Sequence, residues 1–183
     1  MSLRNTDQSF GSLAKFFHWT IALFIIGLLC FGFYMVGIQD EIQREQAFNM
    51  HKLFGLSVLV LASLRLVWRW MNPVPVLPHM PWWELALEKT VKFCLYLAMF
   101  AMPISGWIFS TAAGHAPHIG QFIIPAPFVK LDIHFAGVVF QVHQYTGWAI
   151  IVLLCMHVAG GFKHHFIDKD NILKRMLPGS KIR

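Results

Sequence analysis

Four long apolar runs, separated by shorter polar or proline-rich segments, form the main pattern of this chain. They cover residues 15–38, 47–70, 83–110 and 134–165. Each run is long enough to cross the hydrocarbon core of a bilayer, which takes about 20 residues of α-helix. The first run is too long for a signal-peptide core and no small-residue cleavage site follows it, so we expect it in the mature protein. The pattern predicts an all-α transmembrane four-helix bundle, built as a single domain over residues 1–183.

The segments between the runs have distinct compositions. Residues 39–46, QDEIQREQ, are predicted to be a short charged connection, and the segment after the second run holds four prolines that prevent this helix from continuing. We expect Pro103 and Gly106 to kink the third helix. The longest loop precedes the fourth helix and is rich in Gly, Pro and Ala. The C-terminal tail is basic and partly amphipathic, which predicts a position on the membrane surface.

Composition supports the membrane assignment and excludes several classes. The chain is 56% hydrophobic and 13% charged, with a mean hydropathy of +0.55, values typical of an integral membrane protein. The net charge of +6 does not indicate a nucleic-acid partner, because the basic residues flank apolar runs and form no basic face with interleaved aromatics. The three cysteines stand alone, without CxxC or CxxCH. This excludes a disulfide framework, a cysteine-rich metal site and a covalently attached c-type haem.

The distribution of basic residues predicts the orientation. Twelve of the fifteen lysines and arginines lie in or beside the N-terminal segment, the connection between the second and third helices, and the tail. The positive-inside rule makes that side cytoplasmic, so both termini are expected there. Six of the tryptophans lie near the ends of the runs and are interpreted as interfacial anchors: Trp19, Trp68, Trp70, Trp82, Trp83 and Trp148.

Four histidines fall inside the predicted spans, at two depths. His143 and His157 are fourteen residues apart on the fourth helix, about 21 Å of rise and about 40° short of four full turns, so both face the same way. His18 lies at the inner end of the first helix, and His51 at the outer end of the second. Ionisable side chains inside a span usually mark a functional site. The depths predict an inner pair, His18 with His157, and an outer pair, His51 with His143.

A small residue follows each of these histidines by one helical turn. Residue i+4 projects from the same face as residue i, and here the four residues are Ala22, Gly55, Gly147 and Gly161. A porphyrin lying against a helix needs such a small neighbour, and six-coordinate b-type haem takes two axial imidazoles. We therefore predict two non-covalent haem b groups. The alternative is that the small residues pack helices and the histidines form hydrogen bonds between helices.

Several stretches resemble one family. They are FFHW at 16–19, MHKLFGLSVLVLASLRLVWR at 50–69, HQYTGW at 143–148 and MHVAGGFKHHFIDKDNILKRMLP at 156–178. Together they resemble the bacterial cytochrome b561 family, over nearly the whole chain. The resemblance implies a multi-pass protein of the bacterial inner membrane. It also implies that the family's axial haem-iron ligands correspond to His18, His51, His143 and His157. In four-helix dihaem members it further implies electron transfer from superoxide to ubiquinone.

An electron-transfer reaction is expected at each end of the predicted helix bundle. On the inner side the candidates for a quinone site are Arg65, Arg69, His164 and His165, because a quinone carbonyl needs a hydrogen-bond donor or a proton source. For the two histidines, contact with lipid headgroups is the alternative. On the outer side Lys52 follows His51 directly, and its charge would steer an anion such as superoxide. The alternative for Lys52 is a lysine that snorkels at a helix end.

Three function classes remain open on the sequence. The first is an oxidoreductase that transfers electrons from superoxide on the outer side to ubiquinone. The second is a haem-b electron-transfer subunit that serves a separate dehydrogenase or hydrogenase. The third is a structural or metal-handling membrane protein that uses paired histidines without electron transfer.

Overall fold

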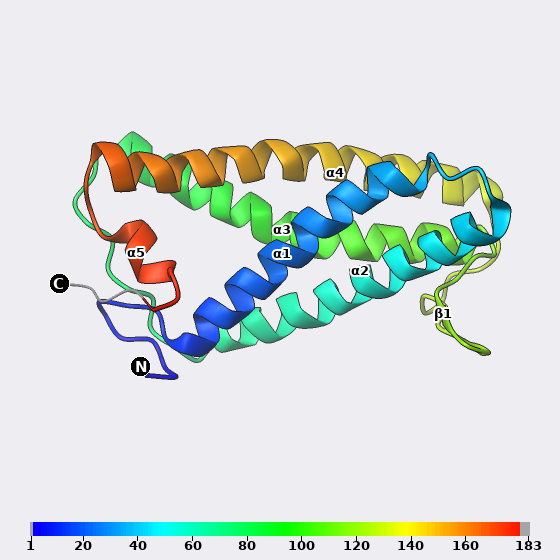
Figure 1. The fold of residues 1–183 in the computed structure, drawn as a ribbon, viewed down its shortest axis with the longest axis horizontal. Helices are drawn as coiled ribbons and strands as arrows, with labels where there is room; N and C mark the ends of the chain where they lie inside the picture. Colours follow the sequence, from blue (N-terminus) through cyan, green and yellow to red (C-terminus); the bar gives the residue numbers. More distant parts are fainter. Residues whose placement is uncertain (1, 180–183) are drawn as a thin grey trace.

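The computed structural model describes residues 2–179 and consists mainly of four long helices (Figure 1). They are α1 (Ser12–Met35), α2 (Glu41–Trp70), α3 (Trp82–Ala112) and α4 (Ile133–Phe162). All four are long and apolar enough to cross a membrane. Large apolar side chains such as Leu23, Val60 and Phe93 are exposed on their surfaces, as expected where lipid covers a helix. The predicted fold of four helices of membrane-spanning length is confirmed.

The α2 helix begins earlier than the apolar pattern predicts. The segment expected as a charged connection is helical from Glu41 onward. The carboxylate of Asp40 accepts a hydrogen bond from the backbone N–H of Gln43 at 2.8 Å, and this N-cap satisfies one of the unpaired donors of the first turn. The prediction of a connection over residues 39–46 is therefore wrong beyond Asp40. These polar turns extend the helix beyond its apolar part.

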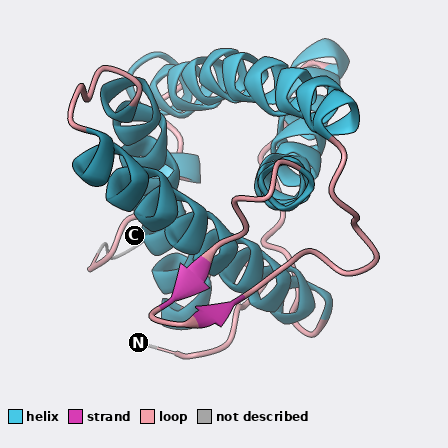
Figure 2. Ribbon diagram, turned by 90° about the vertical axis from the view of Figure 1, so that its right-hand side faces the viewer, coloured by secondary structure: helices cyan, strands magenta, loops and turns pink. Residues whose placement is uncertain are grey.

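The helices pack in chain order. Within residues 2–179, α1 packs along α2, α2 along α3 and α3 along α4, whereas neither α1 nor α2 packs closely on α4. Figure 2 looks along the bundle and shows the helices arranged around its axis. A small core of Ile21, Ala62 and Met99 joins α1, α2 and α3. The α4 helix is thus held mainly by α3.

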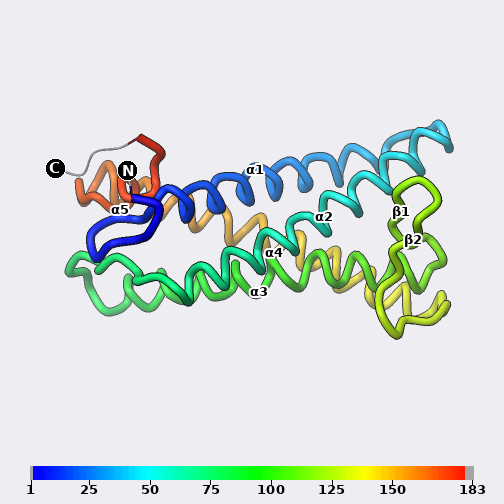
Figure 3. The backbone as a smooth tube through the Cα atoms, turned by 90° about the horizontal axis from the view of Figure 1, so that it is seen from below, coloured from blue at the N-terminus to red at the C-terminus, as the bar shows by residue number. Residues whose placement is uncertain are grey.

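The two ends of the bundle differ. The N- and C-terminal segments lie at one end, which we call the termini end (Figures 1 and 3). The opposite end carries a two-stranded antiparallel hairpin, β1 (His118–Ile119) with β2 (Phe122–Ile123), and we call it the hairpin end. Asn49 of α2 holds the hairpin through two hydrogen bonds to the backbone of His118, at 2.9 and 3.0 Å. The loop before α4 is therefore fixed to α2.

The chain after α4 turns back to the start of α1. It forms a π-helical turn, η1 (Lys163–Ile167), and a short helix, α5 (Ile172–Met176). The indole N–H of Trp19 donates to the carbonyl of Met176 at 2.9 Å, and the ammonium of Lys15 donates to the carbonyl of Leu177 at 3.0 Å. The segment predicted to lie on the membrane surface is thus tied to α1 as far as it is described. Its last four residues lie outside the described residues.

Candidate functional site: two histidine pairs

The structure brings the four membrane-embedded histidines together as two pairs. At the termini end, the ring centres of His18 on α1 and His157 on α4 are 6.1 Å apart and the rings are inclined by 65°. At the hairpin end, the ring centres of His51 on α2 and His143 on α4 are 6.4 Å apart and the rings are inclined by 76°. All four side chains are half-buried. Each pair thus links α4 to a helix on which it does not pack closely.

Both distances suit a pair of imidazoles on one metal ion. A ligating imidazole nitrogen lies about 2 Å from its metal, so two imidazoles on opposite sides of one ion have ring centres about 6 Å apart. The two pairs, at 6.1 and 6.4 Å, match this spacing. The rings of each pair are inclined by 65° and 76°, so they do not stack face to face. The residues present therefore fit two six-coordinate b-type haems, for which the protein supplies two axial nitrogens each.

His143 is held in one orientation by α3. Its Nδ1 lies 2.9 Å from the carbonyl oxygen of Met102 and 3.2 Å from Oγ of Ser105. A carbonyl can only accept, so Nδ1 carries the proton and donates it to Met102, which leaves Nε2 of the neutral ring with a free lone pair. Such a hydrogen bond on the far nitrogen is the usual support of a metal-ligating histidine. A Cβ added at Gly106 would lie 2.9 Å from Cε1 of His143, so the ring occupies this place only because residue 106 is glycine.

His51 has no comparable hydrogen bond. Its Nδ1 is buried and has no partner within residues 2–179. The ring stacks on Phe31 at 6.4 Å with an inclination of 19°, and a Cβ on Gly32 would lie 3.4 Å from its Cε1. A histidine retained for hydrogen bonding between helices would have its ring nitrogens paired, because an unpaired polar group is costly there. For His51 the ligand interpretation is therefore favoured.

His18 has a positively charged neighbour. Nη1 of Arg65 lies 3.1 Å from Nδ1 of His18, and its Nε donates to the hydroxyl of Tyr96 at 3.3 Å. The guanidinium carbons of Arg65 and Arg69 lie 5.7 and 5.5 Å from the centre of the Tyr96 ring, within the range of cation–π contacts. The two predicted arginines are thus brought to the termini-end pair around Tyr96.

The small residues that follow the histidines have different surroundings. A Cβ added at Gly55 would meet nothing within 4 Å, whereas one at Gly147 would lie 3.3 Å from Cε of Met102 and one at Gly161 would lie 3.8 Å from Cδ1 of Leu173. Ala22 is half-buried. Packing against Met102 and Leu173 therefore explains the glycines at 147 and 161 equally well, without a porphyrin. Gly55 is the position where packing gives no reason for a glycine.

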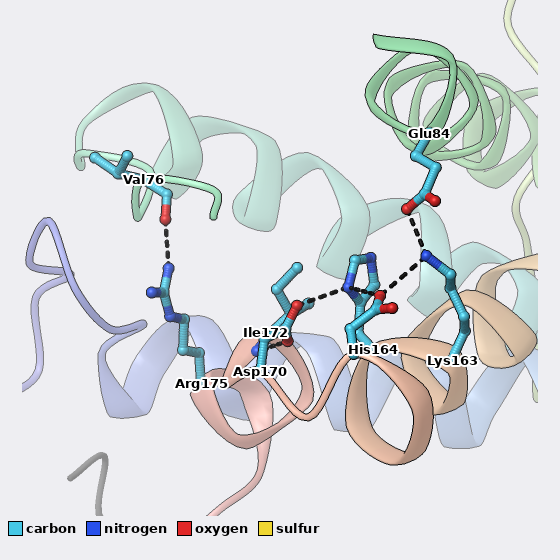
Figure 4. A network of polar contacts seen from close by, with 8 residues as sticks. Val76, Glu84, Lys163, His164, Asp170, Ile172 and Arg175 are labelled. Carbon is cyan, nitrogen blue, oxygen red and sulfur yellow. Dashed lines mark hydrogen bonds and ion pairs between the residues drawn. The ribbon is translucent and has the colours of Figure 1, made fainter. Parts of the chain in front are cut away.

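A second polar cluster lies at the termini end (Figure 4). The ammonium of Lys163 bridges Glu84 of α3, at 2.6 Å, and Asp168, at 3.0 Å. Nδ1 of the buried His164 lies 2.7 Å from Asp170 and 3.1 Å from Asp168. Glu84, His164 and Asp168 have the spacing of a metal site, but both carboxylates already form ion pairs with Lys163. The cluster is therefore an ion-pair network that fastens the C-terminal segment to α3.

The remaining predicted residues have contacts of their own. His165 packs edge-on against Phe166, with ring centres 4.8 Å apart, and its Nδ1 is buried without a partner within residues 2–179. His164 directs Nδ1 to the carboxylates of Asp168 and Asp170. In the described part of the chain it forms no hydrogen bond to Arg65 or Arg69. At the hairpin end the ammonium of Lys52 donates to the carbonyl of His115 at 2.7 Å. Lys52 therefore joins α2 to the loop beside His51.

A four-helix membrane bundle with two facing pairs of half-buried histidines defines a class, the membrane cytochromes that bind b-type haem. Comparison with known proteins gives the family. The family model described as prokaryotic cytochrome b561 matches residues 9–179. The chain therefore belongs to the prokaryotic cytochrome b561 family, whose members bind haem b and transfer electrons in the membrane. The resemblance drawn from the sequence motifs is confirmed.

Curated relatives agree with the family. The chain is 36% identical over 183 residues to cytochrome b561 homolog 2 of Escherichia coli (strain K12), covering 97% of this chain and 95% of the relative. It is 26% identical to cytochrome b561 homolog 1 of the same organism, covering 94% and 98%. It is 23% identical to the probable superoxide oxidase CybB of Yersinia pestis, covering 88% and 91%. The similarity thus extends over nearly the full length of each relative.

Proposed function

We propose that the protein holds two haem b groups, one between His18 and His157 and one between His51 and His143. The observation that carries the proposal is the spacing of the two pairs, 6.1 and 6.4 Å, each across helices that do not pack closely. When bound, the haems would supply one-electron transfer. The four histidine side chains would hold them, and Met102 keeps the proton of His143 on Nδ1, which leaves Nε2 free to bind.

We further propose that the electrons come from superoxide at the hairpin end and pass to ubiquinone at the termini end. Two superoxide ions each lose one electron and become O2, and the quinone takes up both electrons and two protons to become quinol. The relative from Yersinia pestis, named a probable superoxide oxidase, supports the donor. The basic residues at the termini end support its cytoplasmic location in the inner membrane of a bacterium.

Charge at the hairpin end restricts how superoxide is attracted. The acidic side chains there are Asp40, Glu41, Glu45 and Asp132, and the basic ones are Arg44, Lys52 and Lys130. Four negative and three positive charges give a net charge of −1, so the end as a whole does not attract an anion. Attraction has to be local. Lys52 is the residue next to His51, and its ammonium is fixed by the His115 carbonyl, so it supplies this charge beside the histidine pair.

At the termini end, Arg65 and Arg69 supply positive charge beside His18, which favours electron arrival there. His164 and His165 lie on the same end and remain candidates for supplying protons to a quinone. The lipid bilayer delivers the quinone to this end, because quinones are apolar and diffuse within the membrane.

The test starts from an absorbance spectrum of the purified protein. A low-spin haem b gives a sharp α-band on reduction, and a pyridine haemochrome assay should give two haems per chain, removable with acid-acetone. Superoxide is then generated enzymatically beside the detergent-solubilised protein. We expect fast reduction that superoxide dismutase abolishes and a ubiquinone analogue reverses. Reduction by quinol without any response to superoxide would leave a carrier that serves another donor, and the superoxide assignment would be lost.

A further inference from the structure

A pocket lies at the termini end between the start of α1 and the chain that follows α5. Its volume is about 300 Å³, and its lining includes Ser12, Lys15, Phe16, Trp19 and Pro178. Most of the lining is apolar, and Ser12, Lys15 and Thr20 contribute its polar groups. This volume and this mixture are typical of the smaller sites that bind organic molecules. The pocket exists because the C-terminal segment folds back onto α1.

Trp19 connects the pocket to the histidine pair. Its indole lines the pocket, and its ring centre lies 5.3 Å from that of His18 with an inclination of 75°. The hydrogen bond from its Nε1 to the carbonyl of Met176 fixes the indole in this position. A molecule in the pocket is therefore separated from His18 by a single aromatic ring.

Lys15 supplies a buried cation on the wall of the pocket. Its side chain is only 8% exposed, and its ammonium donates to the carbonyl of Leu177 at 3.0 Å. It forms no ion pair with a carboxylate of residues 2–179. An ammonium has three N–H donors, so a ligand with an accepting oxygen would complete its hydrogen bonding.

We propose that this pocket binds the head group of the membrane quinone, with Lys15 donating a hydrogen bond to one quinone carbonyl. The inference rests on the proposed function and names the site where the quinone is reduced. In this arrangement Trp19 lies between the quinone ring and His18, and the isoprenoid chain leaves past Phe16, which is 59% exposed. The quinone takes two electrons, released by two superoxide ions, and two protons taken up at the termini end. The sequence predicts a different quinone site, formed by Arg65, Arg69, His164 and His165, and labelling distinguishes the two sites.

The first experiment maps the site on the haem-loaded protein without measuring turnover. An azido-substituted ubiquinone analogue is bound in the dark, photolysed, and located by mass spectrometry of proteolytic fragments. We expect the label within residues 12–20 and loss of the label in the presence of excess decylubiquinone. A label confined to the end of α2 around Arg65 and Arg69, or one that decylubiquinone does not displace, would overturn the assignment.

The second experiment uses Lys15→Gln, with Lys89→Gln as the matched control, because Lys89 is exposed at the same end. The protein is reduced with dithionite, so superoxide is not needed, and its oxidation by decylubiquinone is followed. Loss of a hydrogen bond from a charged donor should raise the KM for quinone about 10-fold. The haem spectrum and the rate of reduction by dithionite should stay unchanged. Lys89→Gln should behave as the wild type.

The outcomes separate this inference from the function on which it rests. If the quinone oxidises the wild type but Lys15→Gln keeps the wild-type KM and the label falls elsewhere, the pocket is not the quinone site and the proposed function stands. If decylubiquinone neither oxidises nor labels the wild type, quinone is not the acceptor and both proposals fail.

Discussion

Arg65 and His18 form a hydrogen bond, and as long as it persists His18 cannot bind a metal ion through Nε2. Nη1 of Arg65 lies 3.1 Å from Nδ1 of His18, and a guanidinium can only donate, so Nδ1 is the acceptor and the proton of a neutral His18 lies on Nε2. Binding of iron through Nε2 requires the opposite arrangement. The proposed haem binding at this pair would therefore require Arg65 to release Nδ1, and its contacts with Tyr96 would hold the guanidinium nearby.

The charge of Arg65 should raise the reduction potential of the haem at the termini end. A positive charge near the iron disfavours the oxidised, more positive form. Replacing Arg65 by Gln should lower this potential by on the order of 50 mV, equivalent to about 1 kcal/mol. A spectroscopic redox titration measures the shift, with Lys89→Gln as the control. Two unchanged potentials would show that Arg65 does not act on this haem.

The two pairs should behave as separate units. His51→Ala or His143→Ala should remove the haem at the hairpin end and largely spare the other. Each substitution removes one ligand nitrogen from the hairpin-end pair and leaves the termini-end pair intact. His18→Ala or His157→Ala should do the reverse. Haem content should fall from two to one per chain in all four variants, and redox titrations should sort them into two classes. Variants that do not sort in this way would contradict the pairing.

Gly106 should control the position of His143. A Cβ at residue 106 would lie 2.9 Å from Cε1 and 3.1 Å from Nδ1 of His143, so Gly106→Ala has to displace the ring. Overpacking of this kind costs about 1–3 kcal/mol, which corresponds to a loss of haem affinity of about 5- to 150-fold at the hairpin end. Haem titration of the apoprotein measures this loss. The matched control is Gly137→Ala on α4, where a Cβ meets nothing within 4 Å; equal affinities in both variants would contradict the argument.

Gly55 offers a test of space alone. A Cβ there meets no protein atom within 4 Å, so Gly55→Leu should fold normally and yet lose the haem at the hairpin end, since leucine would occupy the place of the porphyrin edge. Circular dichroism checks the fold and the haemochrome assay the content. If Gly55→Leu still holds two haems, the small residue one turn after His51 is not needed to make room for a porphyrin. Gly147→Leu is a weaker test because Met102 lies against this glycine.

Lys52 should accelerate reduction by superoxide. Its loss in Lys52→Gln removes roughly 1 kcal/mol of local attraction for a monovalent anion, which is about a five-fold decrease in rate. Added salt should slow the wild type more than the variant, because screening acts on the charge that the variant lacks. Lys130→Gln, an exposed position on the hairpin-end loop, is the control. If Lys52→Gln is reduced by superoxide as fast as the wild type, the charge of Lys52 does not attract superoxide.

The sequence predicted what depends on helical geometry along a single segment. Apolar length predicted the four spans, and the rise per residue placed His143 and His157 at two depths, from which the pairs with His51 and His18 followed. The early start of α2 was missed because its first turns are polar, although Asp40 and Gln43 have the spacing of a capping box.

Contacts between segments could not be predicted in the same way. The hydrogen bond from His143 to Met102, and the closeness of Gly106 to the ring, depend on the axial register of α3 against α4, which no spacing within either helix specifies. Gly106 was interpreted as a kink, since the sequence does not show what faces it. The pocket around Lys15 depends on the return of the C-terminal segment to α1, where the tail had been assigned to the membrane surface.

The α4 helix supplies one histidine to each pair, and it is the last of the four long helices to leave the ribosome. A nascent chain that has inserted α1, α2 and α3 already contains His18 and His51, but each still lacks its partner. Neither pair can be complete until α4 has entered the membrane and docked on α3. At the proposed sites, cofactor loading therefore follows the insertion of α4, because a chain stalled before residue 143 contains only His18 and His51.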